Sequence, residues 1–245
     1  MTGWFRSAAT AFVAPAGRRY RTWTGRTVLI AALVVCVGIA SGMPRAVAAR
    51  YEVGYNGFTA QGRMQVAPRG NGRWSMSLHV GNALASLQQA TVFDIQEGRL
   101  RPLGNSRVTT TPLTHRTIIG RFDWRVARWA LGGDAKPSQR RQVALQAGDL
   151  DPLLVELALV EDVREGRPTR YRVLENGRAR QLDYRRLAAE PVTIEGHQRQ
   201  AIKLFASEGR KRYVAWVVPD LPLPVRLLQS EQGGDTIDMR LVGFE

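Results

Sequence analysis

The chain has one cysteine, three lysines and no acidic residue before Glu52. The cysteine is Cys36, so no disulfide can stabilise the chain that follows it. A fold without disulfides must be held by its own core, and roughly 200 residues are enough to bury one. We therefore expect a single domain after the first segment.

The sequence also has few features that indicate catalysis or metal binding. His79, His115 and His197 stand alone, without the close spacing that brings two ligands to one metal. No Gly-x-Ser-x-Gly motif is present. Asp149 and Asp151 are explained by helix capping. We predict that the protein is not an enzyme and has neither a catalytic residue nor a metal or cofactor site.

Long apolar runs are scarce too, and the longest, residues 27–40, is shorter than the roughly 20 residues that span a bilayer. It follows an arginine-rich start and precedes the small-x-small pattern Ala46-Val47-Ala48. These features are typical of a secretory signal. We predict a signal peptide over residues 1–48, cleaved between Ala48 and Ala49 or, as the next choice, before Arg50.

The predicted location is therefore the periplasm, or more generally outside the cytoplasm. The alternative is an uncleaved signal anchor that holds the protein in the inner membrane through residues 27–40. Six of the 35 basic residues precede residue 50, which leaves 29 basic against 21 acidic residues and a net charge of +8. Because export removes nucleic acid as a partner, anionic lipid or lipopolysaccharide phosphate suits this charge better.

One stretch has strong helix signals, from Asp151 to Gly166. Asp151 suits the N-cap, Pro152 the first helical position, and Gly166 the left-handed residue that ends a helix. The first two turns are apolar on nearly every side, apart from Glu156. Such a helix must be covered on more than one side, so we predict that a sheet wraps around it.

The rest of the chain from residue 49 to 245 alternates between short β-type segments and turn residues, which is typical of an antiparallel meander. Asn176-Gly177 and Gly233-Gly234 predict tight hairpins, and Gly132–Gly148 predicts a loop. The expected fold is mainly β with one central helix. The expected strands are Arg50–Asn56, Ala60–Ala67, Arg73–Val80, Gln89–Gln96, Leu100–Thr110, Arg116–Trp124, Arg128–Leu131, Thr169–Leu174, Arg178–Tyr184, Val192–Ile194, Arg199–Ala206, Arg212–Val218, Val225–Gln229 and Thr236–Gly243.

Three stretches together resemble a known family. They are the start Tyr51–Gly57, the central helix beginning at Asp151, and Trp216–Arg226 with its Pro-Asp-Leu-Pro-Leu-Pro segment. In this order they resemble the bacterial domain of unknown function family 3108, over Tyr51–Phe244. The resemblance implies an exported protein with a curved antiparallel sheet or half-barrel around a helix, similar to lipoprotein-localisation carrier proteins. It implies no activity.

Two functions remain from this sequence. One is binding of a lipid or other amphiphile in the concave sheet. The other is a structural or protein-interaction module of the cell envelope, with contact to the membrane limited to a signal anchor or a peripheral surface. The candidate apolar pocket residues are Phe122, Trp124, Trp129 and Trp216, and the candidate contacts to an anionic head group are Arg121, Arg125 and Arg128.

Overall fold

The computed structural model describes residues 44–245. This part of the chain forms sixteen strands, one α-helix and one short 3-10 helix. The first strands are β1 (Val47–Tyr55), β2 (Phe58–Gly70), β3 (Arg73–Gly81), β4 (Ser86–Gln96), β5 (Arg99–Thr111), β6 (Thr114–Asp123), β7 (Arg128–Gly133) and β8 (Val143–Ala144). The helices are η1 (Pro137–Gln139) and α1 (Pro152–Arg164). The remaining strands are β9 (Arg170–Glu175), β10 (Arg178–Asp183), β11 (Arg185–Arg186), β12 (Glu190–Ile194), β13 (His197–Glu208), β14 (Lys211–Val217), β15 (Arg226–Glu231) and β16 (Thr236–Phe244).

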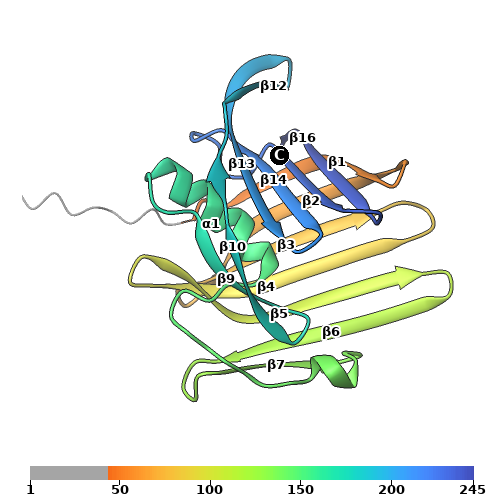
Figure 1. Ribbon diagram of the computed structural model, residues 1–245, viewed down its shortest axis with the longest axis vertical. Helices are drawn as coiled ribbons and strands as arrows, with labels where there is room; N and C mark the ends of the chain where they lie inside the picture. The colour runs from red at the N-terminus through yellow and green to blue at the C-terminus, as the bar shows by residue number, and fades with distance from the viewer. Residues whose placement is uncertain (1–43) are drawn as a thin grey trace, which may run out of the picture. The chain divides into compact units, whose positions relative to one another are not determined.

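The strands build one large, curved, open sheet with α1 on its concave side (Figure 1). The strand order is β11-β13-β14-β15-β16-β1-β2-β3-β4-β5-β6-β7-β8, and β12 pairs with β13 beside β11. Neighbouring strands are antiparallel throughout. The first and last long strands meet in the middle of the sheet, where Tyr51 pairs with Leu241. The predicted curved antiparallel sheet around one helix is confirmed.

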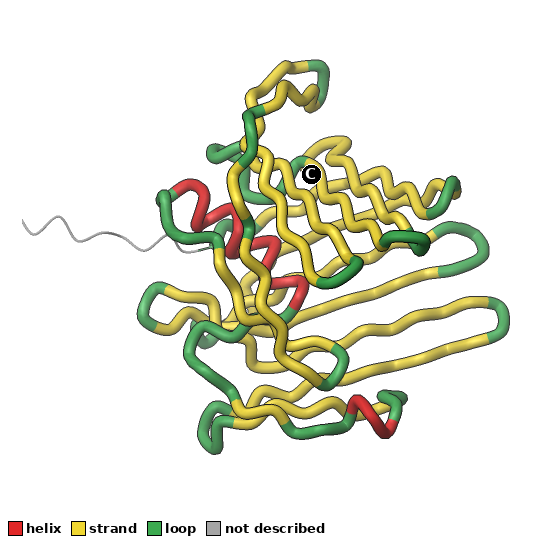
Figure 2. The backbone as a smooth tube through the Cα atoms, viewed as in Figure 1, coloured by secondary structure: helices red, strands yellow, loops and turns green. Residues whose placement is uncertain are grey.

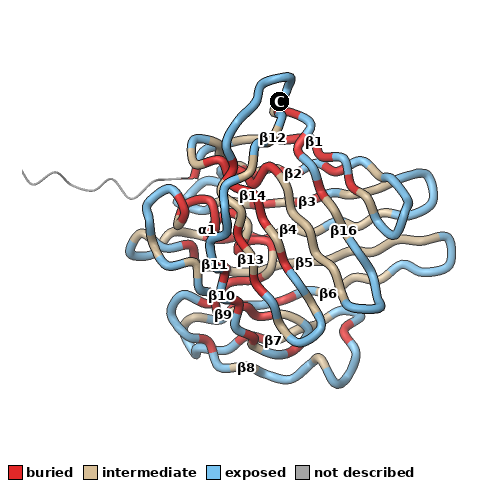
Figure 3. Tube along the Cα trace, turned by 45° about the horizontal axis from the view of Figure 1, so that its top comes forward, coloured by how far each residue is buried: buried red, intermediate tan, exposed pale blue. Residues whose placement is uncertain are grey.

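The helix begins and ends where its sequence signals predict. The Asp151 side chain accepts a hydrogen bond from the Leu154 amide at 3.0 Å, Pro152 occupies the first turn, and Gly166 has a φ of 68°. α1 packs against β3, β4, β5, β9 and β14. Figures 2 and 3 show the helix lying across the concave face, with the buried residues concentrated in it and in the strand segments beside it.

The faces of the strands follow the alternation of the sequence. Phe122 is buried while its neighbours Arg121 and Asp123 are exposed, and Met239 and Leu241 are buried next to the exposed Arg240. This is the expected result for an antiparallel sheet with one wet face.

The hairpin of β9 and β10 leaves the large sheet and lies with α1 on the concave side. Leu150, just before the helix, forms a parallel bridge to Val173 of β9. Ion pairs attach the hairpin to both halves of the sheet, because Glu175 contacts Arg107 of β5 and Arg180 contacts Glu208 of β13. The hairpin thus connects two sheet regions that are far apart in strand order.

Three short elements, η1, β8 and β11, differ from the sequence-based expectation. The segment Gly132–Gly148, predicted as a loop, contains the end of β7, the helix η1 and the two-residue strand β8, which pairs with β7. β11, also two residues long, was not predicted. Elements this short bury too little surface to leave a periodic pattern, so only tertiary contacts define them.

The predicted cleavage bond between Ala48 and Ala49 lies within β1, where the Ala48 carbonyl accepts a hydrogen bond from the Glu245 amide at 2.8 Å. The predicted signal segment up to residue 43, including residues 27–40, lies outside the described residues. Between residues 44 and 245, no helix is long and apolar enough to cross a membrane.

The turn between β9 and β10 gives a direct test of how the hairpin is seated. Gly177 and Gly57 hold the same place in Asn-Gly turns, with φ values of 79° and 86°. A Cβ at residue 177 would lie 2.7 Å from the Gln139 Cα, whereas a Cβ at residue 57 meets nothing within 4 Å. Gly57→Ala should cost about 1–2 kcal/mol in unfolding free energy for its left-handed backbone, and Gly177→Ala about 1–3 kcal/mol more because η1 must move. Urea unfolding measures both, and equal losses would contradict the contact with η1.

Candidate functional site

A small cavity lies between the concave face of the sheet and the start of α1. Its volume is about 50 Å³. The sheet contributes side chains from β4, β5, β6 and β7, and the cover consists of the first turn of α1 and the end of β9. Its lining is mixed: the apolar side chains are Ile118, Trp129, Leu131, Pro152, Leu153 and Leu174, and the polar ones are Gln89, Thr91, Asn105, Ser106, Arg107, Asp151, Glu175 and Asn176.

Asp151 anchors the polar side of this cavity. It caps α1 through one carboxylate oxygen, and the other accepts hydrogen bonds from the hydroxyl of Thr91 and from the Asn105 amide, the latter at 2.8 Å. Burial raises the pKa of the Asp151 carboxyl, against the opposing effect of these three hydrogen bonds and of the Arg107 charge. The start of the helix is therefore fixed to β4 and β5 through one side chain.

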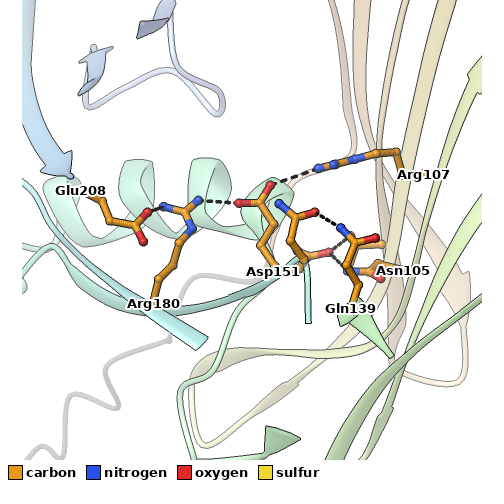
Figure 4. Close-up of polar contacts among 9 residues, drawn as sticks. Asn105, Arg107, Gln139, Asp151, Arg180 and Glu208 are labelled. Carbon is orange, nitrogen blue, oxygen red and sulfur yellow. Dashed lines mark hydrogen bonds and ion pairs between the residues drawn. The ribbon is translucent and has the colours of Figure 1, made fainter. Parts of the chain in front are cut away.

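A chain of ion pairs runs beside the cavity (Figure 4). Arg107 contacts Glu175 at 3.2 Å, Glu175 contacts Arg180 at 3.1 Å, and Arg180 contacts Glu208 at 3.2 Å. The Arg180 guanidinium also lies 5.1 Å from the centre of the Tyr213 ring. These four side chains come from β5, β9, β10 and β13, so the chain joins the hairpin to both sides of the sheet.

Trp129 contributes an unusual group to the cavity. It is 1% exposed, and its indole N–H has no hydrogen-bond partner among residues 44–245. The strand pairing Phe122–Trp129 turns both rings to the concave side, where their centroids are 6.1 Å apart. The facing residue Gly120 leaves room for the indole, since a Cβ there would lie 3.1 Å from its nitrogen. A buried donor without an acceptor costs free energy, so this N–H calls for an explanation.

A second group of unpaired atoms lies deeper along the helix. One carboxylate oxygen of Glu156 and the Nε of Arg180 are buried without a hydrogen-bond partner in the described part of the chain. Burial raises the pKa of Glu156 to about 8, and the nearby Arg180 charge only partly offsets this. The Glu156 charge in turn helps to raise the pKa values of the Tyr51 and Tyr184 hydroxyls, after the larger effect of their burial. The polar interior thus extends from the cavity toward the middle of the helix.

The structure brings together three of the four predicted pocket aromatics. Phe122 and Trp129 are buried in one apolar cluster, and the partly buried Trp124 packs against it while donating a hydrogen bond to the Pro102 carbonyl at 2.6 Å. Only Trp129 lines the cavity. Trp216 belongs to the other core cluster, on β14, where its N–H is bonded to Glu190 at 2.7 Å.

The three predicted head-group arginines do not reach the cavity. Arg121, Arg125 and Arg128 are exposed, and Arg121 lies on the opposite face of β6 from the buried Phe122. Arg107 of β5 is the arginine that lines the cavity. Its inward position follows from the register, since it pairs with Ile118, which also lines the cavity. The sequence pattern alone does not show that Arg107 pairs with Ile118, so it does not predict that Arg107 faces the cavity.

A family model and a solved structure resemble this chain. The family model described as "Protein of unknown function (DUF3108)" matches residues 50–242. No curated protein matches the chain. Among solved structures, the β-barrel-like protein of the domain of unknown function DUF1849 from Brucella abortus superimposes with a TM-score of 0.56. It shares 9% sequence identity, and the alignment covers 82% of this chain and 97% of that protein, so the likeness concerns the fold.

Proposed function

Because the chain belongs to the DUF3108 family, whose description gives no function, we propose a function from the site itself. We propose that the protein is an exported envelope protein that binds an amphiphile at the cavity beside the start of α1 and catalyses no reaction. The observation that carries this proposal is the buried N–H of Trp129, which has no partner among the described residues, at a cavity with a mixed apolar and polar lining. A ligand with a hydrogen-bond acceptor would satisfy that donor, and Arg107 favours an anionic acceptor.

The size of the cavity determines which part of the ligand would enter it. A single water needs about 10–15 Å³ of such space, so about 50 Å³ accommodates a small polar group and not an acyl chain. The space between sheet and helix is otherwise packed with buried side chains. We therefore place the head group inside, near Trp129 and Arg107, in place of the exposed Arg121, Arg125 and Arg128.

The apolar part of the ligand would lie outside the cavity along the concave face. Leu87 precedes the cavity residue Gln89 by two positions on β4, so the two side chains share that face. Leu87 pairs with Val80 of β3, and Val80 and Ala60 are partly buried apolar residues that pack against the core. Together they continue the apolar surface from the cavity toward β2, where a chain would be covered on one side only.

The alternative, a module that adds a partner strand to the sheet, is less well supported by the edges. One edge is the two-residue strand β8, and at the other β13 is covered by β11 and β12. β12 has five residues, of which Pro191 lacks an amide donor. Short edges interrupted by proline are typical of sheets that avoid strand addition.

The test is a titration of the exported protein with a fluorescent fatty acid, together with mass spectrometry of lipids that copurify. Trp129→Phe keeps an aromatic side chain but replaces the indole by a smaller phenyl ring without the unpaired donor, so the probe should bind roughly fivefold more weakly, the equivalent of one hydrogen bond. Trp216→Phe makes the same chemical change outside the cavity and should leave the dissociation constant unchanged. Absence of both probe binding and copurified lipid would overturn the proposal.

A further inference from the structure

Three hairpin turns lie side by side at one end of the sheet, joining β1 to β2, β3 to β4 and β5 to β6 (Figure 2). Their residues are Tyr55–Phe58, Asn82–Ala85 and Thr111–Thr114, and none of them is charged. The three turns at the opposite end, 68–73, 96–99 and 124–128, each carry charged residues. The two ends of this meander therefore differ in polarity, although both are formed by turns between consecutive strands of the same sheet.

The uncharged turns also present large apolar side chains to solvent. Phe58 is 71% exposed, Leu84 72% and Leu113 96%, and Tyr55 is exposed beside Phe58. Each of the three turns contributes at least one such residue. We call Phe58, Leu84 and Leu113 the apolar rim.

Hydrogen bonds fix the first two of these turns. In the first turn, the Tyr55 hydroxyl and the side-chain amide of Asn56 donate hydrogen bonds to the Asp235 carboxylate at 2.9 and 2.7 Å. In the second, the amides of Leu84 and Ala85 donate to the Asn82 side chain at 2.9 and 3.0 Å. Apolar groups on such fixed turns cannot easily fold back onto the protein, so they stay available to a partner.

We propose that the apolar rim docks on the surface of a bilayer that contains anionic lipid. Adjacent strands lie about 4.8 Å apart, so the tips of successive hairpins are about 10 Å apart along the row. Separate apolar side chains at this spacing suit a fluid interface, which closes around each one. A protein partner instead needs a continuous packed contact of about 800 Å² on each side.

The charge of the chain fits the same partner. The net charge of +8 from residue 50 onward attracts the protein to an anionic leaflet. The three turns carry no acidic residue of their own. The one carboxylate bonded to them, that of Asp235, accepts hydrogen bonds from Tyr55 and Asn56 of the first turn. The proposal uses residues outside the cavity, so it does not depend on the proposed amphiphile binding.

The experiment places an environment-sensitive fluorophore on the rim of the full chain. Cys36→Ser leaves no other cysteine, so Leu84→Cys and Leu113→Cys can each be labelled singly. Val126→Cys is the matched control, because Val126 is a 51% exposed apolar residue in a turn at the opposite end. With vesicles of phosphatidylethanolamine and phosphatidylglycerol, the labels at 84 and 113 should brighten roughly twofold or more and be quenched by spin-labelled lipid. The label reports the position of the rim even if another segment also holds the membrane.

A second measurement uses Phe58→Ser, Leu84→Ser and Leu113→Ser together. Because these side chains are exposed, the triple variant should keep its unfolding midpoint but bind the same vesicles roughly tenfold more weakly or worse. An unchanged response at 84 and 113, or an equal response at 126, overturns the proposal. A fluorescence response of equal size with vesicles of phosphatidylcholine alone would contradict the proposed requirement for anionic lipid.

Discussion

Truncating Leu154 to alanine should lower the unfolding free energy by about 2–5 kcal/mol, within the range for large-to-small changes in packed cores. Leu154 is 0% exposed and lies in the first turn of α1, against the concave face of the sheet. The polar anchor at the same turn, Asp151 with Thr91 and Asn105, holds the helix in position, so the cavity left by the missing methyl groups cannot easily collapse. Incomplete collapse places the expected loss in the upper part of that range.

Urea unfolding followed by tryptophan fluorescence measures this loss. Leu157→Ala, at a second buried position of the same helix, should give a loss of similar size. Arg164→Ala, at the exposed last residue of α1, is the control and should change the unfolding free energy by less than about 0.5 kcal/mol. An unchanged midpoint in both leucine variants would mean that the helix contributes little to the core.

The sequence predicts the helix and the faces of the long strands because both depend on local features. Asp151, Pro152 and Gly166 act within a few residues of the helix ends, and their roles are confirmed. Alternation along a strand needs no knowledge of its neighbours, which is why the inward position of Phe122 and Leu241 follows from the sequence. The family resemblance adds the curved sheet around the helix.

The candidate site is less predictable because it depends on strand order. Trp129 and Trp216 both lie on strands that the sequence predicts, yet β7 and β14 are in distant parts of the sheet and the two rings enter different core clusters. Arg107 and Glu175 are 68 positions apart when they pair. Alternation with Phe122 predicts that Arg121 faces outward, but the residues around Arg107 give no comparable signal for its inward position.

The departure of β9 and β10 from the main sheet accounts for most of this difficulty. If β9 and β10 were two more strands of the meander, Glu175 and Arg180 would lie on the large sheet like any other strand residues. In the structure they lie with α1, so their charged side chains point into the interior and meet Arg107 and Glu208. The buried apolar side chains Val173, Leu174 and Leu182 also hold this hairpin in the core. High salt should therefore loosen a hairpin that contacts the cavity only modestly, since its ion pairs are themselves partly buried.

Glu156 gives the second large expected effect. Its pKa is raised by burial to about 8 in the folded protein, against about 4.3 in an unfolded chain. Between these two values the folded state binds a proton that the unfolded state has lost, so the unfolding free energy falls as the pH rises through this window. Glu156→Gln removes the titrating carboxyl group and keeps the shape of the side chain. The part of the decrease in unfolding free energy that Glu156 causes should therefore disappear in the variant. Above pH 8 the variant should be more stable than the wild type, by up to about 5 kcal/mol.

The measurement is the unfolding free energy from pH 5 to 9 for the wild type, Glu156→Gln and Glu161→Gln. Glu161, on the same helix, has its pKa raised by burial to about 7, so its substitution should remove only the part of the fall that ends near pH 7. The fall between pH 7 and 8 should therefore persist in Glu161→Gln and vanish in Glu156→Gln. Parallel curves for all three proteins would show that Glu156 is charged at neutral pH, and the Arg180 guanidinium would then be its counter-ion in the interior.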